Sequence, residues 1–149
     1  MSGYLLDTNV ISMFAPDKQP VSLPLQEWIR QESANDALYI SAITAGEIQR
    51  GISKLARKGS TEKARKLTQW LSGLVAQFDS RILPVDAAVA MAAGSIEEDA
   101  ESRGQRPGLA DVLIAATAST NDLTVVTLNI RHFAPLGVPF MSPEDIAAL

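Results

Sequence analysis

The sequence has 149 residues, of which 46% are hydrophobic, and 13 Lys and Arg residues against 17 Asp and Glu residues give a net charge of −4. A chain of this length can remove roughly 68–70% of its unfolded surface from water, so one domain can hold a core without disulfide bonds or a structural metal. The absence of cysteine excludes a disulfide scaffold and any zinc or iron–sulfur site built on thiolates. The negative net charge also argues against nucleic acid as a partner, unless the charges are unevenly distributed.

No stretch of the sequence resembles a membrane span or a secretory signal. The longest apolar run, near residues 112–116, is far below the roughly 18 residues that a span needs. The N-terminus leads directly into Tyr4-Leu5-Leu6 without a basic region. We therefore expect a cytoplasmic protein without membrane contact.

Short apolar runs in the first part of the chain predict strands that alternate with helices. Residues 4–6 predict a strand, and the polar residues 7–9 predict a turn after it. Leu25, Trp28 and Ile29 follow Pro24 at helical spacing and predict an amphipathic helix. A second strand is predicted at 38–40.

Two consecutive amphipathic helices are predicted between residues 44 and 78. Thr44 and Glu47 have the spacing of a capping box at the start of the first helix. Gly59-Ser60 interrupts the pattern, and apolar residues then recur at spacings of three and four over 67–78. We expect these helices to form a hairpin.

The remaining sequence continues the alternation of strands and helices. Its predicted elements are a strand at 82–85, a helix capped by Asp86, a helix over 109–120, strands over 123–127 and 138–141, and a last helix from Ser142. Pro84 cannot donate to a strand ladder and favours a sheet edge. The alternation predicts a three-layer α/β domain with a mostly parallel sheet. Without repeats or linkers, residues 1–149 are expected to form one domain.

Acidic and amide side chains stand where the predicted strands end. Because ligands bind beyond the carboxyl ends of parallel strands, we expect these side chains to share one crevice. Three close carboxylates need a cation or must take up protons. Oxygen ligands suit Mg²⁺ or Mn²⁺, which can activate water and neutralise charge on a phosphodiester. The residues are Asp7 and Asn9 after the first strand, Glu47 in the first helical turn after the second, Asp111 in the first turn of the helix before the fourth, and Asn129 after the fourth.

Each acid also has a purely structural interpretation. Glu47 can complete the capping box with Thr44, and Asp111 can oppose the dipole of its helix. Residues 7–9 can form a hydrogen-bonded turn. Capping does not explain why the acids gather at strand ends that would share one crevice, so their joint placement favours the metal site.

Four sequence blocks then carry a resemblance to a known family. They are LLDTNVIS (5–12), SAITAGEIQRGI (41–52), ADVLIAATA (110–118) and VTLN (126–129). In order and spacing they resemble the PIN-domain ribonucleases, in particular the VapC/FitB-like toxins of toxin–antitoxin pairs, from about residue 4 to Pro143. The resemblance implies a three-layer α/β/α fold with a five-stranded sheet of order 3-2-1-4-5 and a protruding helical hairpin. It also implies a Mg²⁺- or Mn²⁺-dependent endoribonuclease that leaves 3′-hydroxyl and 5′-phosphate ends.

The resemblance also assigns roles to individual residues. By position, Asp7, Glu47 and Asp111 match the acidic triad of the family, which implies Asp7 and Asp111 as metal ligands. Glu47 would bind metal or orient the attacking water. Asn129 stands at the position of a fourth catalytic acid, and its neutral amide leads us to expect one tightly held ion. His132, the only histidine, departs from the family pattern and has either a loop role or a proton-shuttling role.

Lysine and arginine are concentrated on the predicted hairpin. Residues 50–66 carry seven cationic residues against Glu62, so this segment has a charge of +6 and the rest of the chain −10. Arg50 and Lys54 are therefore candidates to bind RNA phosphates, with a solvated helix face as the alternative. Arg131 and Asn9 are candidates to bind the substrate near the cleaved bond. The lack of an aromatic cluster favours structured RNA over a long single strand.

The resemblance implies protein partners as well. One partner is a second copy of the chain, which would form a homodimer. The other is a small DNA-binding antitoxin, which would form a hetero-oligomer with the toxin and place an extended segment along a groove. Apolar residues that are candidates to line the groove, with core packing as the alternative, are Ile11, Met13, Phe14, Leu25 and Trp28.

Two other functions stay open at this point. Asn129 and His132 leave room for a PIN-like protein that binds RNA without cutting it. A phospho-accepting receiver domain would use Asp86 as the acceptor, but the chain lacks an acidic pair after the first strand and a lysine after the last. The sequence does not indicate which RNA would be cut.

Overall fold

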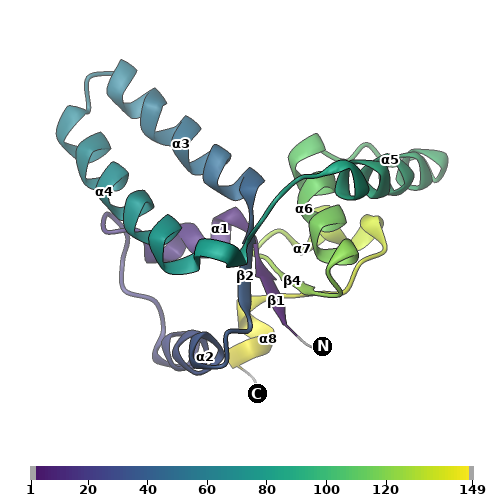
Figure 1. Cartoon of the computed structure of the whole chain (residues 1–149), viewed down its shortest axis with the longest axis horizontal. Coiled ribbons are helices and arrows are strands. Elements are labelled where there is room, and N and C mark those ends of the chain that lie inside the picture. The colour runs from purple at the N-terminus through teal and green to yellow at the C-terminus, as the bar shows by residue number, and fades with distance from the viewer. Residues whose placement is uncertain (1–2, 148–149) are drawn as a thin grey trace.

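A five-stranded parallel sheet lies at the centre of the molecule (Figure 1). The computed structural model describes residues 3–147. Its strands are β1 (Tyr4–Leu6), β2 (Leu38–Ser41), β3 (Ile82–Leu83), β4 (Thr124–Val126) and β5 (Phe140–Met141). All strand pairings are parallel, and the order is β3-β2-β1-β4-β5. The predicted fold class and strand order are confirmed, and the strand before Pro84 lies at the sheet edge.

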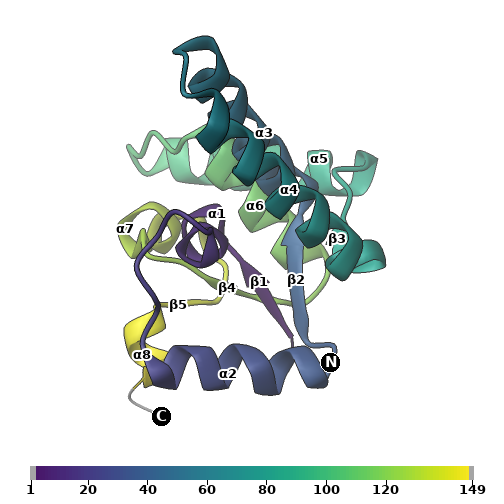
Figure 2. The same ribbon diagram turned by 90° about the vertical axis from the view of Figure 1, so that its left-hand side faces the viewer.

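Alternate residues of the central strands build a core on each face of the sheet. Leu5 and Val125 pack on one face, and Leu6 and Val126 on the other, as the two-residue period of a strand requires. Helices α2 (Leu23–Ala34) and α8 (Pro143–Ala147) contribute to the core under Leu6. Helices α5 (Ala87–Ser102) and α6 (Leu109–Thr120) cover the face of Leu5 (Figure 2). The two cores hold the strand ends in a fixed arrangement.

The predicted helical hairpin is present and projects from the sheet. It consists of α3 (Ala42–Arg57) and α4 (Thr61–Phe78), which run side by side in Figures 1 and 2. Ile48 and Ile52 of α3 are buried in the same cluster as Leu71 and Leu74 of α4. Gly59 turns the chain between the helices with φ +89°, a conformation that glycine adopts without strain.

The start of α3 differs from the prediction. The helix begins at Ala42, because the Ser41 hydroxyl accepts a hydrogen bond from the Ile43 N–H at 3.1 Å and caps it. Thr44 is therefore fully buried inside the helix, and Glu47 lies in the second turn. The predicted capping box between Thr44 and Glu47, and the placement of Glu47 in the first turn, are both wrong.

Several short helices replace predicted turns and loops. They are α1 (Thr8–Ile11), η1 (Ser12–Phe14), η2 (Asp79–Arg81), α7 (Ile130–Phe133) and η3 (Ala134–Leu136). Asp7 caps α1, since its carboxylate accepts from the Thr8 N–H. Two of these helices, α1 and α7, directly follow the loops at the ends of β1 and β4. Among the described residues, none of the helices combines the length and the apolar character that crossing a bilayer requires.

Candidate active site

Three acidic side chains reach the carboxyl ends of the central strands from different elements. Asp7 follows β1, Glu47 lies on α3 beyond β2, and Asp111 lies in the first turn of α6. Glu47 and Asp111 both act on Asp7 electrostatically, and each raises the pKa of the Asp7 carboxyl. The structure thus brings Glu47 and Asp111 into the range of the charge of Asp7.

Asp7 is the most deeply buried of the three. Its residue is only 3% exposed, and burial is the largest cause that raises the pKa of its carboxyl. Two hydrogen bonds act in the opposite direction: the Thr127 hydroxyl donates to Oδ2 at 2.7 Å, and the Thr8 N–H donates to Oδ1 at 2.8 Å. The net shift of the pKa is upward, so the ionised form is disfavoured despite both donors.

The loop after β4 is joined to the loop after β1 at this point. While the Thr127 hydroxyl donates to Asp7, its oxygen accepts from the Asn129 N–H at 2.9 Å. The Asn9 side-chain oxygen accepts from the Leu128 N–H at 3.1 Å. These bonds hold Asp7 in one orientation and place Asn129 at the exposed start of α7.

Glu47 is held by Thr8, a residue that the sequence did not single out. The Thr8 hydroxyl donates to Glu47 Oε1 at 2.5 Å and lies 3.0 Å from the hydroxyl oxygen of Thr44. A threonine in a short polar segment or at a strand end carries no distinctive signal in a sequence. Thr8 and Thr127 are thus recognised only from contacts between distant segments, and Thr44, predicted as a helix cap, contacts Thr8 instead.

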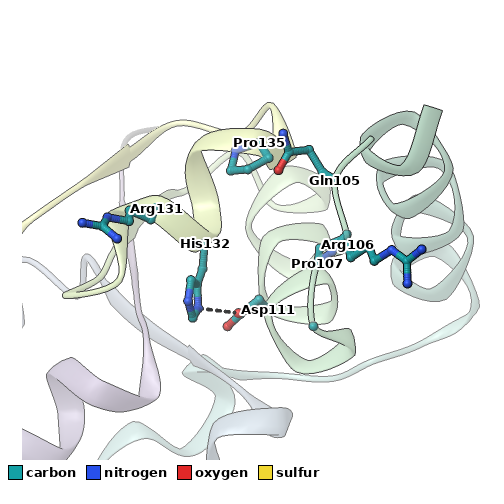
Figure 3. A pocket seen from close by; sticks show the side chains of 8 residues that line it. Gln105, Arg106, Pro107, Asp111, Arg131, His132 and Pro135 are labelled. Carbon is teal, nitrogen blue, oxygen red and sulfur yellow. Dashed lines mark hydrogen bonds and ion pairs between the residues drawn. The ribbon is translucent and has the colours of Figure 1, made fainter. Parts of the chain in front are cut away.

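Asp111 pairs with the single histidine. His132 Nδ1 lies 3.1 Å from Asp111 Oδ2, and Figure 3 marks this contact with a dashed line. The pair borders a cavity of about 290 Å³ between the α5–α6 loop and α7. The other lining residues are Gln105, Arg106, Pro107, Gly108, Arg131 and Pro135.

The acids have the donor chemistry of a divalent metal site. Their ligands would be oxygen atoms only, which hard cations prefer, and a bound cation would offset the burial and the repulsion that raise the pKa of Asp7. In residues 3–147, however, no three acids or histidines are already placed together around one ion position. Each carboxylate instead contacts a protein group: Asp7 contacts Thr127, Glu47 contacts Thr8, and Asp111 contacts His132. The donor set fits Mg²⁺ or Mn²⁺, and binding requires that these side chains turn toward the ion.

The cationic candidates lie on the exposed surface around the acids. Arg50 and Lys54 follow Glu47 on α3 at spacings of three and four, so all three share one side of the helix. Among the described residues, neither cation forms an ion pair. Arg131 lies on α7, close to the Asp111–His132 pair (Figure 3).

Two further predicted features have structural positions. Asp86 caps α5 by accepting from the Val89 N–H at 3.0 Å, which gives the receiver-type acceptor a structural role. Of the apolar groove residues, Met13 and Leu25 line a cavity of about 580 Å³. Ile11, Leu25 and Trp28 are all buried in the core, so Leu25 only borders this cavity. Only part of the predicted lining borders a cavity, and the antitoxin groove stays a prediction.

Comparisons with known proteins match most of the chain. The family model "PIN domain" matches residues 4–136. Toxin FitB of Neisseria gonorrhoeae is 34% identical over 140 residues, which cover 93% of this chain and 96% of that protein. Ribonuclease VapC2 of Rickettsia felis is 32% identical over 130 residues, which cover 87% and 89%.

Solved structures give the same result. FitAcB from Neisseria gonorrhoeae has a TM-score of 0.81 at 33% identity and covers 95% of this chain and 98% of its own. VapBC2 from Rickettsia felis, bound to a DNA fragment from their promoter, has a TM-score of 0.75 at 27% identity, with the same coverage of 95% and 98%. This chain therefore belongs to the PIN-domain family, and the VapC and FitB toxins are its homologues.

Proposed function

We propose that this chain is a Mg²⁺- or Mn²⁺-dependent endoribonuclease and the toxin of a toxin–antitoxin pair. The observation that carries the proposal is the buried Asp7, whose pKa is raised by burial and by the charges of Glu47 and Asp111 at one end of the sheet. A site that disfavours its own charge in this way is suited to receive a cation. The names of the homologues, ribonuclease VapC2 and toxin FitB, support the activity and the biological role.

In this proposal Asp7 and Asp111 hold the metal, and Glu47 holds metal or orients the attacking water. The bound ion supplies Lewis acidity and an activated water. Thr127 holds the Asp7 carboxylate in position, and Thr8 does the same for Glu47. Asn129 completes the site with a neutral amide. Attack at phosphorus breaks the bond to the 3′ oxygen and leaves a 3′-hydroxyl and a 5′-phosphate.

RNA would approach along the basic side of α3. Arg50 and Lys54 bind phosphates there, and Arg131 and Asn9 bind near the cleaved bond. The amide NH₂ of Asn9 suits this role, because only its oxygen is used in the bond to Leu128. Exposed guanidinium and ammonium groups that lack an acidic partner are suited to phosphate.

The proposed protein partners are a second copy of the chain and a small DNA-binding antitoxin. The cavity of about 580 Å³ near Met13 and Leu25 offers apolar surface to an extended antitoxin segment. The solved VapBC2 assembly, bound to a DNA fragment from their promoter, supports a partner of this kind. Growth arrest on expression, relieved by a neighbouring gene for a small DNA-binding protein, would establish the toxin role.

One observation favours a second candidate, a PIN-like protein that binds RNA without cutting it. In the described part of the chain the acids are turned to protein donors, with Asp111 against His132 and no group of three around an ion position. Such a protein would bind RNA and leave it intact at every Mg²⁺ or Mn²⁺ concentration.

Cleavage assays separate the two candidates. The wild-type chain and the Asp7→Asn and Asp111→Asn variants are incubated with RNA in Mg²⁺, in Mn²⁺ and in EDTA, and the ends of the products are mapped. We expect cleavage only with a divalent ion, and a loss in each variant that exceeds the roughly 10–100-fold typical of changes around metal ligands. Glu98→Gln, on the exposed side of α5, is the matched control. Full activity of either variant would overturn the role of that residue.

A further inference from the structure

The cavity beside Asp111 has two walls that come from distant parts of the chain. One wall is the loop of residues 105–108 between α5 and α6, and the other is formed by α7 and η3 (Figure 3). Its volume of about 290 Å³ is just below the roughly 300–1,000 Å³ typical of small-molecule pockets. The cavity is therefore suited to one planar group and too small for a duplex.

Both walls are held in place by specific contacts. Arg103 Nη2 donates to Asp99 Oδ2 at 2.9 Å and to the Pro135 carbonyl oxygen at 2.6 Å, which ties the end of α5 to η3. Gly104 turns the chain after α5 with φ +80°, and its N–H donates to the Glu101 carbonyl at 2.9 Å. Phe133 is fully buried and anchors α7 to the core. The cavity is thus a preformed feature of the fold.

The lining combines flat apolar surface with one amide. Pro107 and Pro135 are half-buried, one on each wall, and their rings offer apolar faces to a planar group. Figure 3 shows the Gln105 side chain directed toward Pro135. A glutamine amide both donates and accepts hydrogen bonds, as the edges of nucleobases do. This combination fits a nucleobase better than it fits a charged or an aliphatic ligand.

Cationic side chains lie on both sides of the cavity. In Figure 3, Arg106 and Arg131 extend in opposite directions, with the Asp111–His132 pair between them. Both are exposed, and neither forms an ion pair with any acid in residues 3–147. Guanidinium groups bind phosphates through paired hydrogen bonds. An RNA strand that contacts both arginines would pass near the Asp111–His132 pair.

We infer that this cavity binds one unpaired base of the RNA next to the cleaved bond. Gln105 reads the edge of the base, the two prolines contact its faces, and Arg106 and Arg131 hold the flanking phosphates. The inference rests on the proposed function and adds to it a determinant of base preference. It is consistent with structured RNA as the substrate, because proteins read bases that are turned out of loops.

Binding in EDTA tests the pocket without cleavage. The probes are four RNA stem-loops with one common stem and loops of only A, C, G or U, and fluorescence anisotropy gives the Kd of each. We expect the wild-type chain to prefer one loop by about 5- to 150-fold, the range of one well-read base. Gln105→Ala should lose that preference, and Gln105→Glu should change which loop is preferred, because it removes the donor.

Two controls identify the cause of any change. Gln31→Ala, on the exposed surface of α2, should keep the wild-type preference. Arg106→Ala should weaken the binding of all four stem-loops by the same factor, because a phosphate contact does not distinguish bases. Arg106→Lys should recover part of this affinity. Equal Kd values for the four loops with the wild-type chain, or an unchanged preference in both Gln105 variants, would overturn the inference.

Mapping of cut sites in a random RNA pool separates this inference from the proposed function. If the wild type cleaves with a base preference and Gln105→Ala cleaves without one, the result supports both the nuclease function and the base pocket. Cleavage with the same preference in Gln105→Ala overturns the pocket and leaves the nuclease in place. Base discrimination in EDTA without cleavage in any divalent ion overturns the nuclease and leaves the pocket in place.

Discussion

At the scale of single residues, Asp7 shows how the site opposes the stability of the fold. Its carboxylate is buried beside two other acids, and burial together with these charges outweighs the hydrogen bonds from Thr127 and Thr8. Groups with perturbed pKa values collect at functional sites, where stability is given up for chemistry. Asp7 is therefore the residue at which a substitution should separate stability from activity.

Asp7→Asn should stabilise the metal-free protein at neutral pH. Because the folded-state pKa of Asp7 is raised above its ordinary 3.8, the stability that its proton provides is present below that value and is lost as the pH rises through the folded-state pKa. Asparagine carries no charge and keeps an oxygen for the Thr8 N–H. We expect a higher melting temperature at pH 7. For a chain of this size, each kcal/mol gained in the free energy of unfolding raises the melting temperature by about 2–4 °C.

Thermal unfolding followed by circular dichroism in EDTA, from pH 3.5 to pH 8, checks this expectation. The difference between the variant and the wild type should shrink as the pH falls toward 3.8. An equal or lower melting temperature of Asp7→Asn at pH 7 would show that the hydrogen bonds outweigh the burial. Cleavage activity should be lost in the same variant.

The acids of the site were predictable from sequence, whereas the residues that orient them were not. Asp7, Glu47 and Asp111 stand at positions where strand ends and helix starts meet, which the alternation of elements reveals. The contact of Thr8 with Glu47 joins residues 39 positions apart, and that of Thr127 with Asp7 joins residues 120 positions apart. Contacts at these separations depend on the assembled sheet and leave no local pattern.

At the scale of elements, α3 links the acids to the basic surface. It starts at the end of β2 under the cap of Ser41 and places Glu47 in its second turn. Arg50, Lys54 and Arg57 continue along the same side of the helix at spacings of three and four. A strand of RNA that follows this side would contact cations before it reaches Glu47.

Removing charges from this side of α3 should reduce the salt dependence of RNA binding. For Lys54→Gln combined with Arg57→Gln, the slope of log Kd against log salt should fall by about 1 for each lost phosphate contact. Anisotropy titrations in EDTA between 50 and 200 mM salt measure this slope. Arg30→Gln on α2, whose side chain pairs with Glu27, is the matched control and should keep the wild-type slope. An unchanged slope in the double variant would identify the basic side of α3 as an ordinary solvated surface.

The elements that the sequence did not predict are the short helices beside the site. Helix α1 spans only Thr8–Ile11 and depends on the Asp7 cap and on the burial of Val10 and Ile11. Helix α7 spans Ile130–Phe133 and depends on the burial of Phe133. A helix of one turn has no periodicity to detect, because tertiary packing rather than propensity stabilises it. The long helices, in contrast, were predicted from their apolar spacing.

At the scale of the whole molecule, the net charge of −4 hides two opposed regions. Residues 50–66 carry +6 and project on the hairpin, while the remaining chain carries −10 and includes the acids at the strand ends. The parallel sheet creates this contrast. It gathers residues 7, 47 and 111 near the carboxyl ends of its strands, whereas residues 50–66 project away from the sheet. Without a cation, the acids at these strand ends weaken the binding of phosphate. We therefore expect metal binding to affect both the stability of the fold and the binding of RNA.

Divalent ions should consequently stabilise the wild-type protein more than a variant that lacks a ligand. A ligand that binds only the folded state contributes about 2.7 kcal/mol at a concentration of 100 times its Kd. For a chain of this size, that corresponds to a rise of about 5–10 °C in melting temperature. Titrations of the wild type, Asp111→Asn and the control Glu98→Gln with Mg²⁺ and Mn²⁺ measure it. We expect the wild type and Glu98→Gln to respond equally and Asp111→Asn to respond much less, because it loses a metal ligand. An equal rise in melting temperature for all three proteins would mean that the ion binds at other acidic residues and that Asp111 is not a metal ligand.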